Sequence, residues 1–387
     1  MKKIAVVTST RAEYGLLSPV LKELRKQEND MLRIELIVTG THLSDKYGKT
    51  IVEIDDRIDH QISIPVNSRS ALDISSNQAK ALVEFTELFI SEEYDAVMLL
   101  GDRYETLAFA IAAGNTMTPI FHLCGGDTTE GAIDEWIRHS ITKMSYLHFV
   151  TNEESRRRVI QLGEDPSRIF NYGSTSIDNI FTMADMSKEE ALKSVGLADD
   201  CKYALCTYHP VTIENGSVDS KIKNFLEAIK VFPDMEFIVT KSNADQGGER
   251  INELLDIAEA EIDNLQVFTS LGVRRYLSLM KYSELVVGNS SSGIIETPAF
   301  GVPTVNIGDR QSGRLQVESI INCGENTEEI VEAIRKAIAD NHKEICKKII
   351  GAYGDGHAAE RIARKSIDII LSGSINLKKK FYSLGEE

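Results

Sequence analysis

The sequence lacks paired cysteines and an excess of basic residues. Its five cysteines are odd in number, and none forms a C-x-x-C pair. This argues against a disulfide framework or a zinc site and favours a reducing cytoplasm. The 43 Lys and Arg residues are outnumbered by 59 Asp and Glu, for a net charge of −16. A general nucleic-acid or anionic-membrane binder is therefore not expected, although a local basic pocket for one small anion is compatible with this charge.

Long apolar runs are missing as well. No stretch approaches the roughly 18 apolar residues of a membrane-spanning helix. The amino terminus, MKKIAVVTST, lacks the apolar core and cleavage site of a signal peptide, so it is predicted to form a first strand. No low-complexity tract or strict short repeat occurs. We therefore expect a cytoplasmic protein without membrane or nucleic-acid partners.

Short β-branched runs alternate with amphipathic helical patterns along nearly the whole chain. With 42% hydrophobic residues, 387 residues suffice for two cored domains. Alternation of this kind predicts parallel sheets covered on both faces. The expected strands are 3–7, 33–39, 96–100, 118–123, 147–151, 168–173, 202–208, 236–240, 265–268, 284–288 and 302–307.

The pattern restarts after a polar helical stretch at about residues 178–202. We therefore predict a Rossmann-like domain over 1–177 and a second one over 178–355. The fold class is α/β and GT-B-like, with two doubly wound domains and a cleft between them. Ligands of open α/β sheets bind at the carboxyl ends of the strands, so the site is expected there.

The stretch GNSSSGIIE, residues 288–296, stands where a predicted strand passes into a helical pattern. The first N–H groups of a helix lack internal partners and favour an anion. With the hydroxyls of Ser290 and Ser291 added, this turn is a candidate diphosphate cradle without a P-loop lysine. Glu296 lies one turn deeper, where a carboxylate could accept both hydroxyls of a ribose. The alternative is that the serines only cap the helix.

Acidic residues follow two other predicted strands. Asp102 and Arg103 come after the strand 96–100, although Asp102 could be only a helix N-cap. On a later helix Asp134 and Arg138 are four residues apart, a spacing that also suits a surface salt bridge. Carboxylates that lie close together have raised pKa values, which suits proton abstraction near neutral pH. The carboxylates after the double glycine of HLCGGD are Asp127, Glu130, Asp134 and Glu135.

Three more polar side chains follow predicted strands. His209 is a candidate acid for a leaving phosphate, although a lone histidine is more often structural. Arg11 follows the first strand and could meet an anionic group, and Asn243 follows the strand 236–240. Nearly all polar clusters thus fall at strand ends of two doubly wound halves, which predicts one ligand site.

Seven pieces of the sequence resemble a known family, the hydrolysing UDP-N-acetylglucosamine 2-epimerases of sialic-acid-type sugar biosynthesis. They occur in family order and span about the whole chain. The resemblance implies a GT-B-like fold, UDP held mainly by the C-terminal domain, and a final segment, 356–387, that crosses back to the N-terminal domain. The pieces are TSTRAEYG, GDRYETLA, HLCGGDTTEGAIDEWIRHSITK, YHPVT, GNSSSGIIE, NIGDRQSGR and YGDGHAAERI.

The resemblance also implies roles for individual residues. Asp134 would be the base that removes the C2 proton, His209 would assist the leaving diphosphate, and Asp102 would manage protons or water. The reaction would pass through a 2-acetamidoglucal, to which water adds to give N-acetylmannosamine, with no cofactor and no metal. Asp127 is a further catalytic candidate. The residues expected to hold the UDP-sugar are Arg11, Arg103, Arg138, His209, Asn243, Ser290, Ser291, Glu296 and Arg310.

One position departs from the family pattern: Cys124 stands where a glutamate is common. The smaller, less polar side chain is compatible with a relative of the substrate, UDP-2,4-diacetamido-2,4,6-trideoxyglucose. A GT-B glycosyltransferase, a non-catalytic UDP-sugar sensor and a non-hydrolysing epimerase are the other interpretations. A homodimer is expected because two-fold dimers are the commonest closed assembly, with a tetramer as the alternative.

Overall fold

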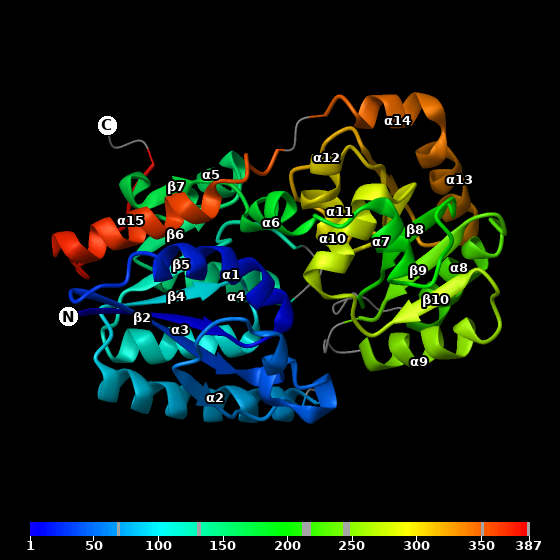
Figure 1. Cartoon of the computed structure of the whole chain (residues 1–387). Coiled ribbons are helices and arrows are strands. Elements are labelled where there is room, and N and C mark those ends of the chain that lie inside the picture. Colours follow the sequence, from blue (N-terminus) through cyan, green and yellow to red (C-terminus); the bar gives the residue numbers. More distant parts are fainter. Residues whose placement is uncertain (68–69, 130–132, 211–217, 243–247, 350–351, 385–387) are drawn as a thin grey trace. The chain divides into compact units, whose positions relative to one another are not determined.

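The computed structural model describes residues 1–67, 70–129, 133–210, 218–242, 248–349 and 352–384, and these form two compact units (Figure 1). The first unit comprises Met1–Asp127, Asp134–Asp178 and Gly354–Glu387. The second comprises Thr128–Ile133 and Asn179–Tyr353. Residues from the end of the chain therefore belong to the same unit as its beginning.

A seven-stranded parallel sheet forms the centre of the first unit, in the order β3-β2-β1-β4-β5-β6-β7. The direction of strand order reverses at β1, so the carboxyl ends of β1 and β4 lie at the switch point where such sheets bind ligands. The strands are β1 Lys2–Thr8, β2 Leu32–Thr39, β3 His60–Ile62, β4 Ala96–Leu100, β5 Ile120–Leu123, β6 Leu147–Val150 and β7 Ile169–Asn171.

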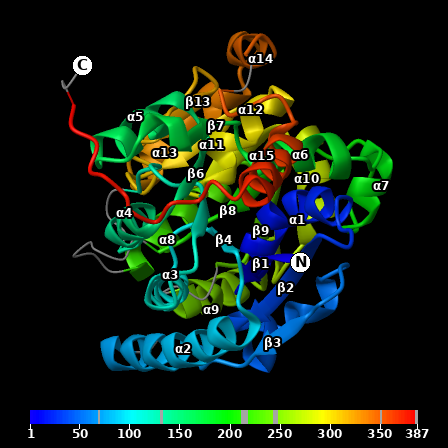
Figure 2. The ribbon, with the colours of Figure 1, turned by 90° about the vertical axis from the view of Figure 1, so that its left-hand side faces the viewer.

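Helices cover both faces of this sheet. α1 begins at a capping box in which Thr10 Oγ1 accepts the N–H of Glu13. α15 lies beside α1 in Figures 1 and 2, and both helices contribute to one apolar cluster with the strands. Among the described residues no helix is both long and apolar enough to cross a bilayer. The helices are α1 Arg11–Arg25, α2 Ala71–Glu92, α3 Tyr104–Asn115, α4 Asp134–Met144, α5 Glu153–Gln161, α6 Thr175–Met183 and α15 Ala358–Ser372, and the short 3-10 turns are η1 Gly40–Leu43, η2 Asp45–Tyr47, η3 Thr50–Glu53 and η4 Pro166–Arg168.

The second unit is built on a six-stranded parallel sheet, in the order β10-β9-β8-β11-β12-β13. Here the reversal falls at β8, so the carboxyl ends of β8 and β11 form the equivalent switch point. The strands are β8 Tyr203–Thr207, β9 Glu236–Thr240, β10 Leu265–Phe268, β11 Leu285–Gly288, β12 Thr304–Ile307 and β13 Ile320–Cys323.

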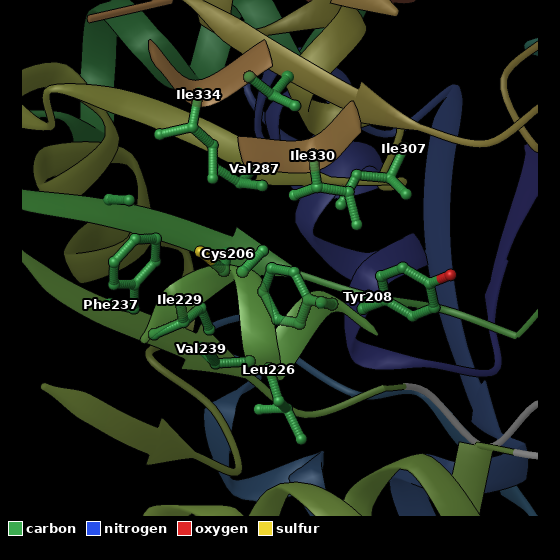
Figure 3. Close-up of a cluster of buried hydrophobic side chains, with 14 of the residues drawn as sticks. Cys206, Tyr208, Leu226, Ile229, Phe237, Val239, Val287, Ile307, Ile330 and Ile334 are labelled. Carbon is green, nitrogen blue, oxygen red and sulfur yellow. The ribbon is translucent and has the colours of Figure 1, made fainter. Parts of the chain in front are cut away.

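Successive side chains of β8 point to opposite faces of the sheet and pack into two different hydrophobic clusters of the second unit. Cys206 packs with side chains of α8 and α13, such as Ile229 and Ile334, in the cluster drawn in Figure 3. Tyr203 and Leu205 point to the other face, in a cluster that includes residues of α10. The helices are α7 Lys188–Lys193, α8 Val218–Ile229, α9 Gly248–Glu259, α10 Gly272–Tyr282, α11 Ser292–Ile295, α12 Thr297–Phe300, α13 Thr327–Ile338 and α14 Asp340–Cys346.

The predicted α/β class with two Rossmann-like halves is confirmed, and each predicted strand overlaps an observed one. The pattern missed β3 and β13, each of which is one of the two edge strands of its sheet. An edge strand is less enclosed than a central one, and β3 buries none of its three residues fully. Its sequence HQI therefore carries no continuous apolar signal.

Candidate functional site

The turn after β11 approaches the neighbouring strand β8 very closely. Gly288 has a φ of +140°, and a methyl group at this position would lie 2.0 Å from the backbone oxygen of Thr207. Only glycine permits both this backbone conformation and this approach. The turn that follows Gly288 is therefore held against the carboxyl end of β8.

Asn289 joins that turn to His209. The Asn289 side chain accepts a hydrogen bond from the His209 N–H at 2.7 Å and donates to the His209 carbonyl at 2.8 Å. The imidazole is held in turn by Ser242, whose Oγ lies 3.1 Å from Nδ1. Asn289 is 1% exposed, so these bonds form away from water. The histidine predicted beside the diphosphate thus lies next to the serine turn.

The serines form a chain of hydroxyls with a tyrosine of α10. Ser290 Oγ accepts from Ser292 Oγ at 3.2 Å, and Ser292 Oγ lies 2.7 Å from the hydroxyl of Tyr276. α11 begins at Ser292 but spans only four residues, and Ser291 at its N-cap position makes no side-chain capping bond. The capping alternative is therefore wrong for Ser291, whereas Ser290 Oγ does accept the N–H of Ser292, the first residue of α11, at 3.4 Å.

The helical pattern that follows the serines is divided into α11 and α12 at Glu296. Pro298 has no N–H, so the regular helical hydrogen bond to residue 294 cannot form. The Glu296 side chain accepts no hydrogen bond from any described residue. Burial raises the pKa of Glu296 to about 7, because the carboxylate loses water without gaining a donor. The role of Glu296 toward a ribose stays a prediction.

Two residues of the loop after β12 bind the serine turn from another side. Arg310 Nη1 donates to the Asn289 carbonyl at 3.1 Å, and Gln311 Nε2 donates to the same oxygen at 2.8 Å. The predicted residues His209, Ser290 and Arg310 are thus gathered around Asn289. Asn243 lies outside the described residues.

In the first unit, a buried arginine organises the acidic cluster. Arg138 of α4 is 1% exposed, and its guanidinium forms an ion pair with Asp102. It also donates to Glu135 Oε2 at 3.0 Å and to the carbonyl of Asp127 at 2.8 Å. Burial opposes ionisation, but the carboxylates outweigh it and keep the pKa of Arg138 above its ordinary value. Arg138, expected among the substrate-binding residues, thus binds three groups of its own unit.

Asp102 does not cap the following helix. α3 begins at Tyr104, so the N-cap position belongs to Arg103, which makes no side-chain capping bond. The preceding Gly101 is fixed by His122, whose Nε2 donates to its carbonyl at 2.8 Å. Burial lowers the pKa of His122 to about 4, so this ring is neutral. The N-cap alternative for Asp102 is therefore wrong, and the side chain is held by Arg138.

Asp127 is enclosed by hydroxyl donors. Its Oδ1 accepts from Thr151 at 2.8 Å and from Ser155 at 2.6 Å, and the residue is 7% exposed. The preceding Gly126 has a φ of +79°, and a methyl group there would lie 2.3 Å from the Ser155 carbonyl. These contacts give Asp127 a structural explanation beside the predicted catalytic one. Asp134 is half-buried as the first residue of α4, and Glu130 lies outside the described residues.

The two predicted cations at the switch point of the first sheet differ in their surroundings. Arg103 Nε donates to Glu105 at 2.7 Å. Arg11 is half-buried as the first residue of α1, and no described residue forms a hydrogen bond or ion pair with its guanidinium. Arg11 is therefore available to an anionic ligand. Cys124, at the carboxyl end of β5, adopts a left-handed backbone with a φ of +64°, which is uncommon for a residue other than glycine.

Among the described residues, one group could bring three metal ligands together: Glu35, His60 and Glu92. Its two carboxylates already have cationic partners, because Lys3 Nζ lies 2.8 Å from Glu92 and Arg33 Nε lies 3.4 Å from Glu35. The group is therefore better described as an ion-pair network, and it lies away from the strand ends described above.

Sequence reasoning missed several residues that support the site. Asn289 lies inside the stretch GNSSSGIIE, and its single amide between a strand and a turn was the available signal. The others are recognisable only from long-range contacts. They are Ser242, which holds His209, Tyr276, which holds Ser292, and His122, which holds Gly101.

Comparisons with known proteins agree on one family. The family model described as UDP-N-acetylglucosamine 2-epimerase matches residues 22–366. A Campylobacter jejuni protein named GDP/UDP-N,N'-diacetylbacillosamine 2-epimerase (hydrolyzing) is 39% identical over 324 residues, which cover 83% of this chain and 84% of the relative. Polysialic acid biosynthesis protein P7 of Escherichia coli is 38% identical over 391 residues, which cover 100% of this chain and 98% of that protein.

A solved structure supports the fold. The crystal structure of UDP-GlcNAc 2-epimerase from Neisseria meningitidis bound to UDP-GlcNAc matches with a TM-score of 0.81 and 20% sequence identity. The match covers 95% of this chain and 100% of that one. The GT-B-like architecture of two Rossmann-like domains is therefore shared.

Proposed function

The chain belongs to the UDP-N-acetylglucosamine 2-epimerase family, and we propose that it is a hydrolysing member that converts UDP-N-acetylglucosamine and water into N-acetylmannosamine and UDP. The observation that carries the proposal is the acidic cluster at the strand ends of the first unit, held by the buried Arg138. A nucleotide-binding protein without chemistry at the sugar has no need of ionised carboxylates at this place.

The second unit supplies the nucleotide site in this proposal. The hydroxyls of Ser290 and Ser291 and the guanidinium of Arg310 bind the diphosphate, and Glu296 accepts the ribose hydroxyls. His209, oriented by Asn289 and Ser242, assists the departure of UDP. Preorganised donors are the larger help, because negative charge builds up on the diphosphate as the C1–O bond breaks.

The first unit supplies the proton chemistry. Asp134 removes the C2 proton while the C1–O bond breaks, which releases UDP and leaves a 2-acetamidoglucal. Water then adds across the double bond, with hydroxyl at C1 and a proton at C2 on the opposite face. Asp102, fixed by Arg138, handles the proton or the water in this second step. Arg11 and Arg103 add positive charge, and neither step requires a metal or a cofactor.

A second substrate is supported by one residue and one relative. Cys124 stands where the family commonly has a glutamate, which leaves a smaller and less polar side chain at the end of β5. The relative from C. jejuni carries diacetylbacillosamine in its name. The alternative is therefore the same hydrolysing reaction on UDP-2,4-diacetamido-2,4,6-trideoxyglucose.

Product analysis separates these possibilities. The protein is incubated with each UDP-sugar in deuterated water, without an acceptor, and followed by NMR. We expect UDP and a free sugar that is inverted at C2 and deuterated there. A UDP-linked product would indicate a non-hydrolysing epimerase. Free N-acetylglucosamine as the only sugar, turnover that needs an acceptor, or binding without turnover would each overturn the proposal.

Asp134→Asn tests the base assignment. The amide keeps the size of the side chain but cannot take a proton, so incorporation of deuterium at C2 should stop while UDP still binds. Asp45→Asn is the control, because the side chain of Asp45 is 90% exposed in another part of the first unit. Deuterium incorporation by Asp134→Asn at the wild-type rate would show that another group is the base.

We further propose that the reaction takes place in the cytoplasm and that the chain forms a homodimer. The five cysteines without paired spacing support the location, and the frequency of two-fold dimers supports the assembly. Light scattering during size-exclusion chromatography measures the assembly directly, and a monomer would contradict it.

A further inference from the structure

Ser9, directly after β1, lies between two buried carboxylates. Its hydroxyl oxygen is 2.7 Å from Glu13 Oε2 of α1 and 3.1 Å from Glu105 Oε1 of α3. The three residues are 0%, 8% and 2% exposed respectively. We call this arrangement the Ser9 bridge. It joins the first turns of two helices at the switch point of the sheet, with Glu105 three residues after Asp102 and Ser9 two residues before Arg11.

The Ser9 bridge has too few hydrogen-bond donors for its carboxylate oxygens. A serine hydroxyl has one hydrogen, so it can donate to only one of the two carboxylates at a time. Glu13 Oε2 also accepts the N–H groups of Ser9 and Thr10. The second oxygens, Glu13 Oε1 and Glu105 Oε2, are buried without a hydrogen-bond partner among the described residues. A proton on Glu13 is the donor that this pair lacks.

The charged side chains near the Ser9 bridge also favour a proton on Glu13. Among the residues that the structure describes, Arg103, 2.7 Å from Glu105 Oε1, is the single cation paired with the two carboxylates. His42 on η1 adds no charge, because burial lowers its pKa to about 4 while Thr8 and Thr50 hold its ring. Arg11 is the remaining charged side chain at the start of α1.

Burial and the nearby Glu105 raise the pKa of Glu13 to about 7, although Arg103 opposes the shift. The protonated form therefore predominates below this pH, and ionisation begins within the physiological range. The opposite assignment, with the proton on Glu105, would remove the partner of Arg103.

We propose that Glu13, Ser9 and Glu105 share one proton and that this protonated bridge positions Arg103 beside Asp102 for the reaction. Glu13 and Glu105 are positioning residues, since they act through Arg103. Loss of the proton leaves two carboxylates competing for one hydroxyl hydrogen and one guanidinium. The contact between Glu105 and Arg103 then weakens, and the segment that carries Asp102 loses its support. The inference rests on the proposed function, in which Asp102 takes part.

Glu13→Gln is the main test, with kcat and KM measured from pH 6 to 8. The amide imitates the protonated carboxyl and still accepts the capping N–H groups, so the variant should fold and match the wild type at pH 6. As the pH rises, the ratio of kcat/KM of the variant to that of the wild type should increase, because only the wild type ionises. Glu87→Gln on the exposed face of α2 is the control, and its ratio should stay constant.

Glu105→Gln tests the other half of the bridge. The amide cannot pair with Arg103 as a carboxylate does, so kcat should fall roughly tenfold to a hundredfold with little change in KM, as expected from misplaced reacting groups. Glu105→Asp, which keeps the charge, should recover part of the loss. If Glu105→Gln does not fold, the Glu13→Gln measurements decide by themselves.

A readout independent of turnover separates this inference from the proposed function. In carboxyl-labelled glutamate NMR, a resonance titrating near pH 7 should disappear in Glu13→Gln and move to lower pH in Glu105→Gln. If the enzyme releases another product but this titration is found, the function is wrong and the shared proton stands. An unchanged pH profile together with an unchanged titration in Glu13→Gln would overturn the bridge.

Discussion

Carboxylates near the strand ends of this protein differ in the donors that surround them. Asp127 accepts two hydroxyl hydrogens from its own unit, and Asp102 is paired with a buried guanidinium. Glu296 is held by no described donor, and its pKa is raised to about 7. A carboxylate that accepts hydrogen bonds from its own protein stabilises the fold. A carboxylate without such donors can accept hydrogen bonds from a ligand. Glu296 is therefore the residue whose proposed contact with a ligand is tested first.

Glu296→Gln should weaken UDP binding in a pH-dependent way. An ionised carboxylate accepts both ribose hydroxyls, and charge-assisted bonds are worth about 1.5–3 kcal/mol each, so the variant should bind roughly tenfold or more weakly at pH 8. The difference should shrink at pH 6, where Glu296 is protonated. Titration calorimetry at several pH values measures it, and comparison of the two proteins cancels the titration of UDP itself. An equal loss at pH 6 and pH 8 would contradict the assignment.

The same substitution has an opposite effect on the unliganded protein. A folded-state pKa raised from 4.5 to about 7 means that the stabilising contribution is complete below pH 4.5 and is lost as the pH rises through 7. Glu296→Gln should therefore gain stability relative to the wild type between these values. Urea unfolding at pH 5 and pH 8 checks the sign.

At the level of secondary-structure elements, the turns after strands are set by close backbone approach. Gly288→Ala would place a methyl group 2.0 Å from Thr207 O with a φ of +140°. We expect a loss of roughly 3 kcal/mol or more in the free energy of unfolding. Gly196→Ala is the matched control, because its φ is +74° but no atom lies within 4 Å, so about 1 kcal/mol is expected. Equal losses in urea unfolding would show that the approach of β8 and β11 is unimportant.

α4 depends on one buried charge. Arg138→Met would leave Asp102 and Glu135 without their shared cation, and breaking a buried pair costs about 3–5 kcal/mol. Arg156→Met on α5 removes a more exposed arginine, whose contact with Glu153 is 3.3 Å, so less than about 1 kcal/mol is expected. Thermal or urea unfolding of both variants measures the difference. A small effect at Arg138 would mean that Asp102 is held in another way.

At the scale of the whole chain, the carboxyl-terminal residues complete the first unit. Lys379 Nζ lies 2.7 Å from the fully buried Glu164, which is also bound by Lys143 at 2.8 Å and by His148 at 3.1 Å. Burial opposes ionisation of Glu164, but these three donors outweigh it and lower its pKa to about 2. A tail distant in sequence thus neutralises a charge inside the fold.

Glu164→Gln should remove this contribution in a pH-dependent way. A pKa lowered from 4.5 to about 2 corresponds to about 3 kcal/mol at pH 7. The contribution is complete above pH 4.5 and is lost as the pH falls toward 2, so wild type and variant should converge in acid. Glu153→Gln, on the surface of α5, serves as the control. A pH-independent difference between wild type and Glu164→Gln would show that packing, not charge, is responsible.

The amino-acid sequence alone determined the class of fold, and it predicted a site at the strand ends. Strand–helix alternation and the small or charged residues after the strands are local patterns, and hydrophobic periodicity is sufficient to read them. Among the described strands only β3 and β13 escaped, and β3 carries no apolar signal because none of its residues is fully buried.

The partners of the side chains were decided only by the tertiary structure. Arg138 pairs locally with Glu135, but its other carboxylate partner, Asp102, lies 36 residues away. Asn289 holds His209 across 80 residues, and the Ser9 bridge joins side chains 96 residues apart. Hydrogen bonds and ion pairs of this kind depend on distances of a few ångströms between segments that meet only after folding, so a local pattern places each residue at a strand end without saying which neighbour it will meet there.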